Sequence, residues 1–272
     1  MKKILCIQAV SLVAVLGGVS AGAAEPTANG ASGANPSANP FAPASFELAT
    51  GLDYSAGRYG AKSDTTILDL PLDLKAQLGR LRLQATLPYD YVKGPGEIVG
   101  GVVVTSPTGT PMRRWGLGDL TVQGAYLLAH AHNGWPAVEL AGAVKLPTAK
   151  TGIGTGETDY ATSVNLYQPV AANTVLFGSL GYSWLGSPAS VALKDGMTGS
   201  VGVNYRPSPA QNLGVSLGYR DKVAAGLKAQ AAVSPYFTQK LGAQWGVTLY
   251  GTGGLTSGSP RLGAGFRLSL IN

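Results

Sequence analysis

The stretch Ile67–Tyr91, "ILDLPLDLKAQLGRLRLQATLPYDY", decides the fold, because apolar and polar residues alternate along it on both sides of Gly79. One set of alternate positions holds Leu, Ala and Tyr, and the other holds mainly Asp, Lys, Arg, Gln, Thr and Pro. A period of two residues is the pattern of a β-strand, and a glycine between two strands permits a tight turn. The stretch therefore predicts a β-hairpin with one apolar and one polar face.

The alternation continues to the end of the chain and predicts about twelve strands, each near the ~9–11 residues that a tilted strand needs to cross a bilayer. The predicted strands are 46–57, 66–78, 80–92, 117–128, 137–147, 159–169, 174–185, 198–206, 213–221, 229–238, 244–251 and 261–271. No further run of 18 or more apolar residues follows the N-terminal region, so no transmembrane helix is expected.

Charged residues separate a membrane barrel from a soluble β-sandwich, which would also alternate. They fall on the polar face of their strands, with acids and bases balanced: Glu47, Asp53, Asp69, Asp73, Lys75, Arg80, Arg82, Asp90, Asp119, Glu139, Lys145, Asp159, Arg206, Arg220, Arg261 and Arg267. A charge that faces lipid at mid-depth costs about 2–4 kcal/mol, so a bilayer enforces this segregation. A solvated sandwich would carry many more Lys and Glu than the 12% charged residues found here. We expect an all-β, transmembrane, antiparallel up-and-down β-barrel.

Aromatic residues and loop lengths support the same fold. One predicted belt holds Tyr54, Tyr89, Tyr91, Tyr160, Tyr182, Trp184 and Tyr219, and the other holds Tyr126, Tyr205, Phe237 and Trp245. Such belts mark the two interfaces of a membrane barrel, whose outer loops are longer than its periplasmic turns. The long predicted loops alternate with short turns, and the loop 93–116 is a candidate constriction of the barrel.

The N-terminal region predicts export. Lys2 and Lys3 precede an apolar core and a small-residue cleavage region, so residues 1–24 are expected to be a signal peptide. Residues 25–45 form an Ala/Asn/Pro/Ser/Gly-rich leader, and residues 46–272 form the barrel. The predicted location is the outer membrane of a Gram-negative cell, with outer-membrane lipid and the barrel-assembly machinery as partners. Cys6, the one cysteine, belongs to the signal, so no thiol chemistry is expected.

The glycine-rich stretch "KLPTAKTGIGTGETDY", Lys145–Tyr160, does not predict a nucleotide site. An alternating segment follows it instead of the helix that a phosphate cradle requires. His130 and His132 lack the further ligands of a metal site and are expected in a solvated turn. We predict no catalytic residue, metal or cofactor, and no nucleic-acid partner, because no basic cluster with interleaved aromatics occurs.

The inward charges are the candidate site. The predicted pore-lining residues are Asp69, Asp73, Lys75, Arg80, Arg82, Asp90, Asp119, Glu139, Lys145, Arg206, Arg220 and Arg267. We expect Arg80 and Arg82 to pair with Asp69 and Asp73 on the adjoining strand. Two interpretations remain: ion pairs that hold a narrow, filled barrel, or a charge-lined channel for small solutes. A closed structural or interaction barrel that acts through its outer loops is the alternative function, and an outer-membrane lipid enzyme is less favoured.

Several motifs resemble one family of outer-membrane barrels. "LPYDYV" (Leu87–Val92), "GLGDL" (Gly116–Leu120), "KLPT" (Lys145–Thr148) and "GTGETDY" (Gly154–Tyr160) are similar to the family named for the MetA pathway of phenol degradation, over roughly Gly79 to Gln168. The resemblance implies an outer-membrane protein that passes small, often aromatic, compounds.

Overall fold

The computed structural model describes residues 44–59, 63–94, 96–99, 102–105, 112–150, 152–189 and 192–272. The predicted signal peptide (1–24) and all but the last two residues of the predicted leader (25–45) lie outside these residues. Among the described residues, no helix is long and apolar enough to span a membrane.

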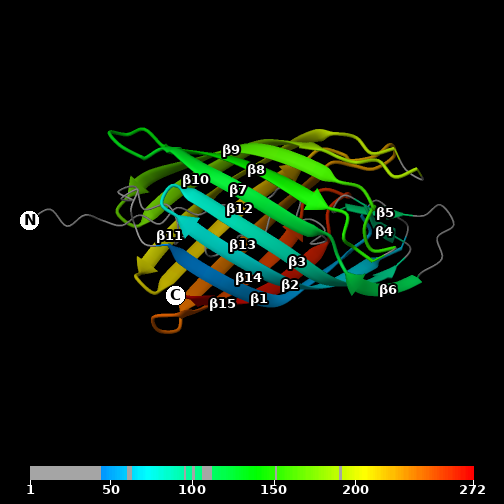
Figure 1. The fold of residues 1–272 in the computed structure, drawn as a ribbon, viewed down its shortest axis with the longest axis horizontal. Helices are drawn as coiled ribbons and strands as arrows, with labels where there is room; N and C mark the ends of the chain where they lie inside the picture. Colours follow the sequence, from blue (N-terminus) through cyan, green and yellow to red (C-terminus); the bar gives the residue numbers. More distant parts are fainter. Residues whose placement is uncertain are drawn as a thin grey trace, which may run out of the picture.

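The chain forms a closed antiparallel β-barrel (Figure 1). Its strands are β1 (Ser45–Gly57), β2 (Thr65–Leu78), β3 (Leu81–Gly94), β6 (Met112–Leu117), β7 (Leu120–Ala129), β8 (Ala137–Leu146), β9 (Asp159–Ala171), β10 (Thr174–Trp184), β11 (Gly196–Ser208), β12 (Gln211–Arg220), β13 (Gln230–Lys240), β14 (Trp245–Gly254) and β15 (Leu262–Ile271). The pairing of β1 with β15 closes the sheet and satisfies backbone N–H and C=O groups that would otherwise face lipid. Among the described strands, β6 pairs on one side only, with β3. The predicted fold class is confirmed.

The fourth strand of the barrel is interrupted, which the sequence did not predict. Its first part, β6, pairs with the second half of β3, and its second part, β7, pairs with the first half of β3. Gly118 and Asp119 separate the two parts. Residues 112–116, predicted to be loop, are therefore wall, because β3 continues to Gly94 and offers them a pairing edge. Counted with this break as one strand, the barrel has the twelve strands expected.

The barrel has two unlike ends. The long-loop end carries residues 58–64, 95–111, 147–158, 185–195, 221–229 and 255–261, and the short-turn end carries 79–80, 130–136, 172–173, 209–210 and 241–244. Within 95–111, β4 (Gly96–Val99) and β5 (Val102–Thr105) form a separate two-stranded sheet.

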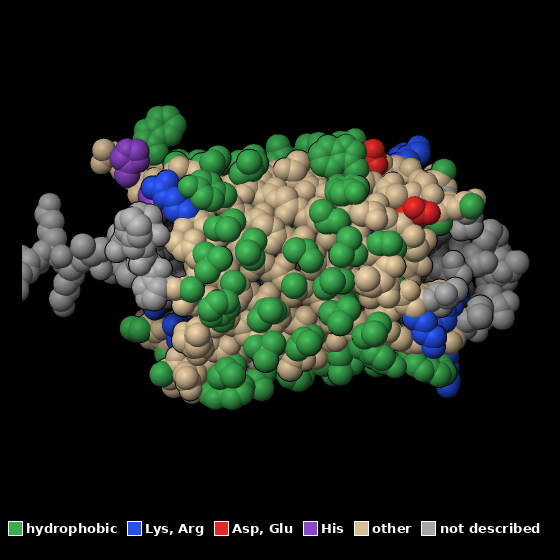
Figure 2. Space-filling model, viewed as in Figure 1, with side chains coloured by type: hydrophobic (Ala, Val, Ile, Leu, Met, Phe, Trp, Pro, Cys, Tyr) green, Lys and Arg blue, Asp and Glu red, His purple; other side chains and the backbone are tan. Residues whose placement is uncertain are grey.

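The outer surface is apolar. On the face in Figure 2, hydrophobic side chains cover the middle of the barrel, and charged side chains lie near its two ends. Exposed charges within the barrel strands are Lys93 and Arg113, which oppose each other one residue from their strand ends. Exposed aromatics lie near both ends: Tyr54, Tyr89, Trp115, Tyr160, Trp184 and Tyr219 near the long loops, and Tyr126, Tyr205 and Trp245 near the short turns. This is the surface of a transmembrane barrel.

Inside the barrel, three aromatic rings lie over glycines of the neighbouring strand. Phe177 covers Gly202, Tyr236 covers Gly214 and Tyr250 covers Gly265, and each ring and glycine are register partners. A Cβ atom at any of these glycines would collide with the ring. The glycines therefore let large side chains lie flat against the inner wall.

Candidate functional site

The inner wall is polar, and most of the predicted site residues are buried in it. Asp69, Asp73, Arg82, Asp90, Asp119, Glu139, Lys145 and Arg267 are each at most 9% exposed. Lys75, Arg80, Arg206 and Arg220 are half-buried. The alternation also placed Arg261 on this face, and that prediction is wrong. Arg261 precedes β15, and its side chain is 76% exposed. Its Nη2 lies 3.8 Å from Oδ2 of Asp64 in the long loops.

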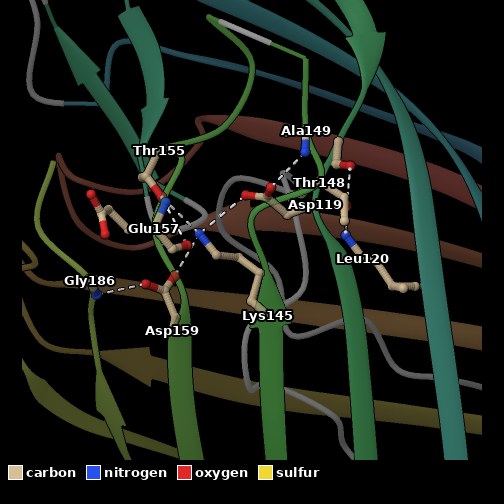
Figure 3. A network of polar contacts seen from close by, with 10 residues as sticks. Asp119, Leu120, Lys145, Thr148, Ala149, Thr155, Glu157, Asp159 and Gly186 are labelled. Atoms are coloured by element: carbon tan, nitrogen blue, oxygen red, sulfur yellow. Dashed lines mark hydrogen bonds and ion pairs between the residues drawn. The ribbon is translucent and has the colours of Figure 1, made fainter.

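Lys145 is the centre of the largest network (Figure 3). Its Nζ lies 2.8 Å from Oδ2 of Asp159 on β9 and 3.2 Å from Oδ2 of Asp119 at the break between β6 and β7. It also donates a hydrogen bond to the Thr155 hydroxyl at 3.1 Å. One ammonium thus neutralises two buried carboxylates from different strands.

The network fastens two long loops to the wall. The backbone N–H of Ala149 donates to Asp119 at 2.9 Å, and that of Gly186 donates to Asp159 at 2.8 Å. Thr148 accepts a hydrogen bond from the N–H of Leu120, just below the strand break. The motifs "GLGDL", "KLPT" and "GTGETDY" therefore meet in space, which explains their residue types without any phosphate-binding role.

A second network lies closer to the short-turn end. Arg82 Nη2 lies 2.9 Å from Oε1 of Glu139. The same oxygen accepts hydrogen bonds from Asn165 at 2.9 Å and Tyr167 at 3.3 Å. Tyr167 also belongs to an apolar cluster inside the barrel with Leu127, Ala137, Val175, Phe177 and Tyr236.

A third network joins the strands that close the barrel. Arg267 on β15 lies 2.7 Å from Asp53 on β1 and 3.5 Å from Asp73 on β2. It donates to the Tyr250 hydroxyl at 2.7 Å, with its guanidinium 5.7 Å from the ring centroid. Nearby, Lys75 lies 3.6 Å from Glu47. These contacts tie β14, β15, β1 and β2 together at the seam.

The predicted ion pairs within the first hairpin are wrong. The register of β2 and β3 places Arg82 opposite Gln77 and Asp73 opposite Thr86. Arg82 and Asp73 instead pair with Glu139 and Arg267, on strands far away in the sequence. Alternation predicts on which face of the sheet a side chain lies. In a hairpin, however, only residues at equal distances from the turn lie opposite each other, and Arg82 and Asp73 lie at different distances from it.

The other predicted residues do not gather at one point. Asp69 and Asp90 are register partners, so two buried carboxyls lie side by side on β2 and β3. Arg206 donates to the carbonyl of Pro209 at the short-turn end, and Arg220 ends β12 at the long-loop end. Sequence reasoning did not assign a role to Asn165, Tyr167 or Tyr250, which are uncharged and lack a recognisable motif.

His130 and His132 lie in the turn 130–136, as expected, on a protrusion at the short-turn end (purple, left in Figure 2). Partial burial, together with the nearby charge of Arg80, lowers the pKa of His130. In the part of the chain that the structure describes, no three His, Cys, Asp or Glu side chains are grouped to hold a metal ion.

Charge is unevenly distributed around the interior. The three networks belong to β14, β15, β1, β2, β3, β7, β8 and β9 and the strand break beside β7. The strands β10 to β13 carry charged residues only near their ends, at Arg206, Arg220 and Lys240, and are otherwise lined by Ser, Thr, Asn, Gln, Gly, Ala, Val and aromatic residues. One part of the wall carries most of the charged side chains, and the other carries few.

Comparison with known families decides the identity of the chain. The family model described as "Putative MetA-pathway of phenol degradation" matches residues 31–270. This chain belongs to that MetA-pathway family. The resemblance seen between Gly79 and Gln168 is confirmed and extends along almost the whole barrel. No curated protein sequence matches the chain.

Solved structures share the fold of this MetA-pathway family member. An outer membrane channel from Pseudomonas putida F1 matches with a TM-score of 0.61 and 13% identity, covering 84% of this chain and 95% of that one. The NanC porin matches with a TM-score of 0.50 and 9% identity, covering 83% and 98%. With its closed barrel and apolar outer surface, the chain is an outer-membrane β-barrel protein.

Proposed function

We propose that the barrel is a passive channel that admits small solutes, including aromatic or weakly hydrophobic compounds, across the outer membrane. The observation that carries the proposal is the inner wall: it is mostly polar, with one apolar cluster that includes Leu127, Phe177 and Tyr236, whereas the outer wall is apolar. The family description refers to phenol degradation, and the similar Pseudomonas putida F1 protein is called an outer membrane channel.

Within this proposal, the predicted site residues line the path and tune its selectivity. The paired charges of the three networks hold the wall in shape. Arg220, which ends β12 near the long loops, is the residue we expect to act on passing ions, because it is an inward cation at that end that belongs to none of the three networks described above.

The test is permeability of the full chain reconstituted into liposomes. We expect solute-dependent swelling with small sugars, amino acids and hydroxybenzoates, and ionic conductance in planar bilayers. Arg220→Gln should shift the ion selectivity toward cations, whereas the control Lys150→Gln, on an exposed loop, should leave it unchanged. Neither swelling nor conductance from correctly folded protein would refute the channel.

That negative result would favour the alternative, a closed barrel that acts through its long loops. We propose no enzymatic activity. The two histidines both lie in the turn between β7 and β8, and the three charged networks contain no histidine.

A further inference from the structure

Two cations lie side by side on the outer surface of the barrel, at its long-loop end. Lys93 on β3 and Arg113 on β6 are register partners, and both side chains are exposed. On the face in Figure 2, Lys and Arg side chains gather at the lower right, in the region that β6 occupies in Figure 1. The outer surface, which is apolar along the middle of the barrel, is therefore positive at this point.

The pair lacks the counter-ion that other exposed cations at the same end possess. Arg58 and Arg261 are exposed too, but Asp64 lies 3.6 Å from Arg58 and 3.8 Å from Arg261. Neither Lys93 nor Arg113 has such a partner among the described residues. Side chains directly opposite each other on antiparallel strands have Cβ atoms about 4.5–5.5 Å apart, and like charges at such positions destabilise the sheet. An anion from outside the chain would relieve this repulsion.

The depth of the pair in the membrane indicates the kind of anion. Two residues nearer the middle of the barrel on the same face, Tyr91 and Trp115 are also register partners, and Trp115 is 54% exposed. Trp and Tyr side chains occupy the head-group level of a bilayer. A strand rises about 3.3 Å per residue, so Lys93 and Arg113 lie roughly 7 Å along the strands from this level, on the side away from the hydrocarbon. The anions within their reach are the phosphates of lipid head groups.

An apolar strip continues from the cations toward the middle of the membrane. Tyr89 and Leu117 are the next outward register partners after Tyr91 and Trp115, and Leu70 on β2 is opposite Tyr89. Tyr89, Leu117 and Leu70 are 44%, 50% and 49% exposed. A free phosphate ion would use the two cations alone, whereas a lipid would cover the cations and the strip together. The combined surface matches an amphiphile with a phosphate at one end.

The length of the loops identifies the leaflet. In outer-membrane barrels the long loops lie on the extracellular side. Lys93 precedes the loop 95–111 and Arg113 follows it, and this is one of the long loops. The pair therefore faces the outer leaflet.

We infer that Lys93 and Arg113 form a binding site, on the outside of the barrel, for the phosphate group of a lipid of the outer leaflet. The Arg113 guanidinium binds two phosphate oxygens, and the Lys93 ammonium acts as a second, point-like charge. The acyl chains lie along the strip below Trp115. The site goes beyond the proposed channel, because it lies outside the lumen. It holds lipid against β6, a strand that pairs only with β3 among the described strands.

Lipid binding can be measured directly. Protein purified in detergent micelles is titrated at about 0.15 M salt, where the Debye length is about 8 Å. The probes are diphosphoryl lipid A, a phosphorylated lipid of the outer leaflet of Gram-negative cells, and the same lipid without its phosphates. Native mass spectrometry counts the lipid that remains bound to the protein.

The double variant Lys93→Gln/Arg113→Gln should bind diphosphoryl lipid A about twenty- to thirtyfold more weakly, since each cation near a membrane surface contributes about fivefold. Its binding of the dephosphorylated lipid should be unchanged. Arg113→Lys, which keeps the charge, should lose less than Arg113→Gln. Equal binding of diphosphoryl lipid A by the wild type and the double variant would overturn the inference.

Arg58→Gln/Arg261→Gln is the matched control, because it removes two exposed cations at the same end that already face Asp64. It should leave the binding of diphosphoryl lipid A unchanged. Equal losses in the two double variants would show a general attraction to the basic end and would overturn the site. Displacement of the lipid by an equal concentration of inorganic phosphate would overturn it as well, because the apolar strip would then contribute nothing.

Thermal unfolding gives a second measurement, which also shows whether the variants fold. In lipid-free micelles, Lys93→Gln/Arg113→Gln should have an unfolding midpoint no lower than that of the wild type, because it removes a repulsion. Added diphosphoryl lipid A should raise the midpoint of the wild type and of the control, but not that of this variant. An equal rise in all three proteins would contradict the site. Because none of these measurements involves permeation, the lipid site and the channel can fail separately.

Discussion

Lys145 and Asp159 are register partners on β8 and β9, and their charged atoms lie 2.8 Å apart inside the barrel wall. The same ammonium also reaches Asp119 beside the break between β6 and β7. Because the two carboxylates accept the N–H groups of Ala149 and Gly186, the pair connects the wall to two long loops. The glycine-rich stretch is thus a structural connection at the long-loop end.

Replacing Lys145 should strongly destabilise the barrel. Lys145→Met leaves two buried carboxylates without their cation, and breaking a buried ion pair costs about 3–5 kcal/mol. Equilibrium unfolding of the full chain in liposomes, followed by tryptophan fluorescence, measures the change. Lys150→Met, on an exposed loop position, should stay within about 0.5 kcal/mol of the wild type. A similar small effect for Lys145→Met would contradict the assigned role.

Arg82 and Glu139 should be energetically coupled. Each single change, Arg82→Met or Glu139→Gln, leaves the partner buried and uncompensated, whereas the double variant removes both charges. We expect the double variant to be more stable than the sum of the single losses by about 0.5–3 kcal/mol. A double-mutant cycle in urea measures this energy, and strict additivity would show that the 2.9 Å contact contributes nothing.

Gly214 should not tolerate a larger residue. In Gly214→Ala, the new Cβ meets the Tyr236 ring, and such overpacking costs about 1–3 kcal/mol. Adding Tyr236→Leu should recover part of this loss by removing the obstruction. Gly142→Ala is the control, because its Cβ has 3.8 Å to the nearest atom. Unfolding midpoints of the wild type and these three variants measure the effect. A loss in Gly142→Ala as large as in Gly214→Ala would exclude the ring contact as the cause.

The anchoring of the loop 221–229 should weaken in acid. The Tyr219 hydroxyl, which donates to Asp221 at 2.6 Å, and the Met197 N–H at 2.9 Å lower the pKa of Asp221. A lowered pKa in the folded state gives stability that is present above the unfolded value of about 3.9 and is lost as the pH falls through the folded value. The wild type should therefore exceed Asp221→Asn in stability near neutral pH, and the two should converge as the pH falls below the folded-state pKa of Asp221. A pH-independent difference in unfolding midpoint would rule out ionisation of Asp221 as its source.

Alternation by itself fixed the fold class and the inner or outer face of most charged residues. The reason is physical: a strand has a period of two, and lipid excludes charge from one face. From this pattern the sequence predicted twelve strands, the aromatic belts near both ends and the polar inner position of residues such as Asp73, Glu139 and Lys145. The family motifs were also visible, because they are local.

Tertiary structure alone decided which residues meet. Arg82 binds Glu139, Arg267 joins Asp53 to Asp73, and Tyr236 covers Gly214, because closure of the barrel and the register of each strand pair bring distant positions to one level. The break at Gly118 and Asp119 likewise depends on how far β3 extends as a pairing edge. A periodic pattern gives the direction of a side chain, but the height of a side chain along the barrel follows from strand pairing, which no local pattern in this chain determines.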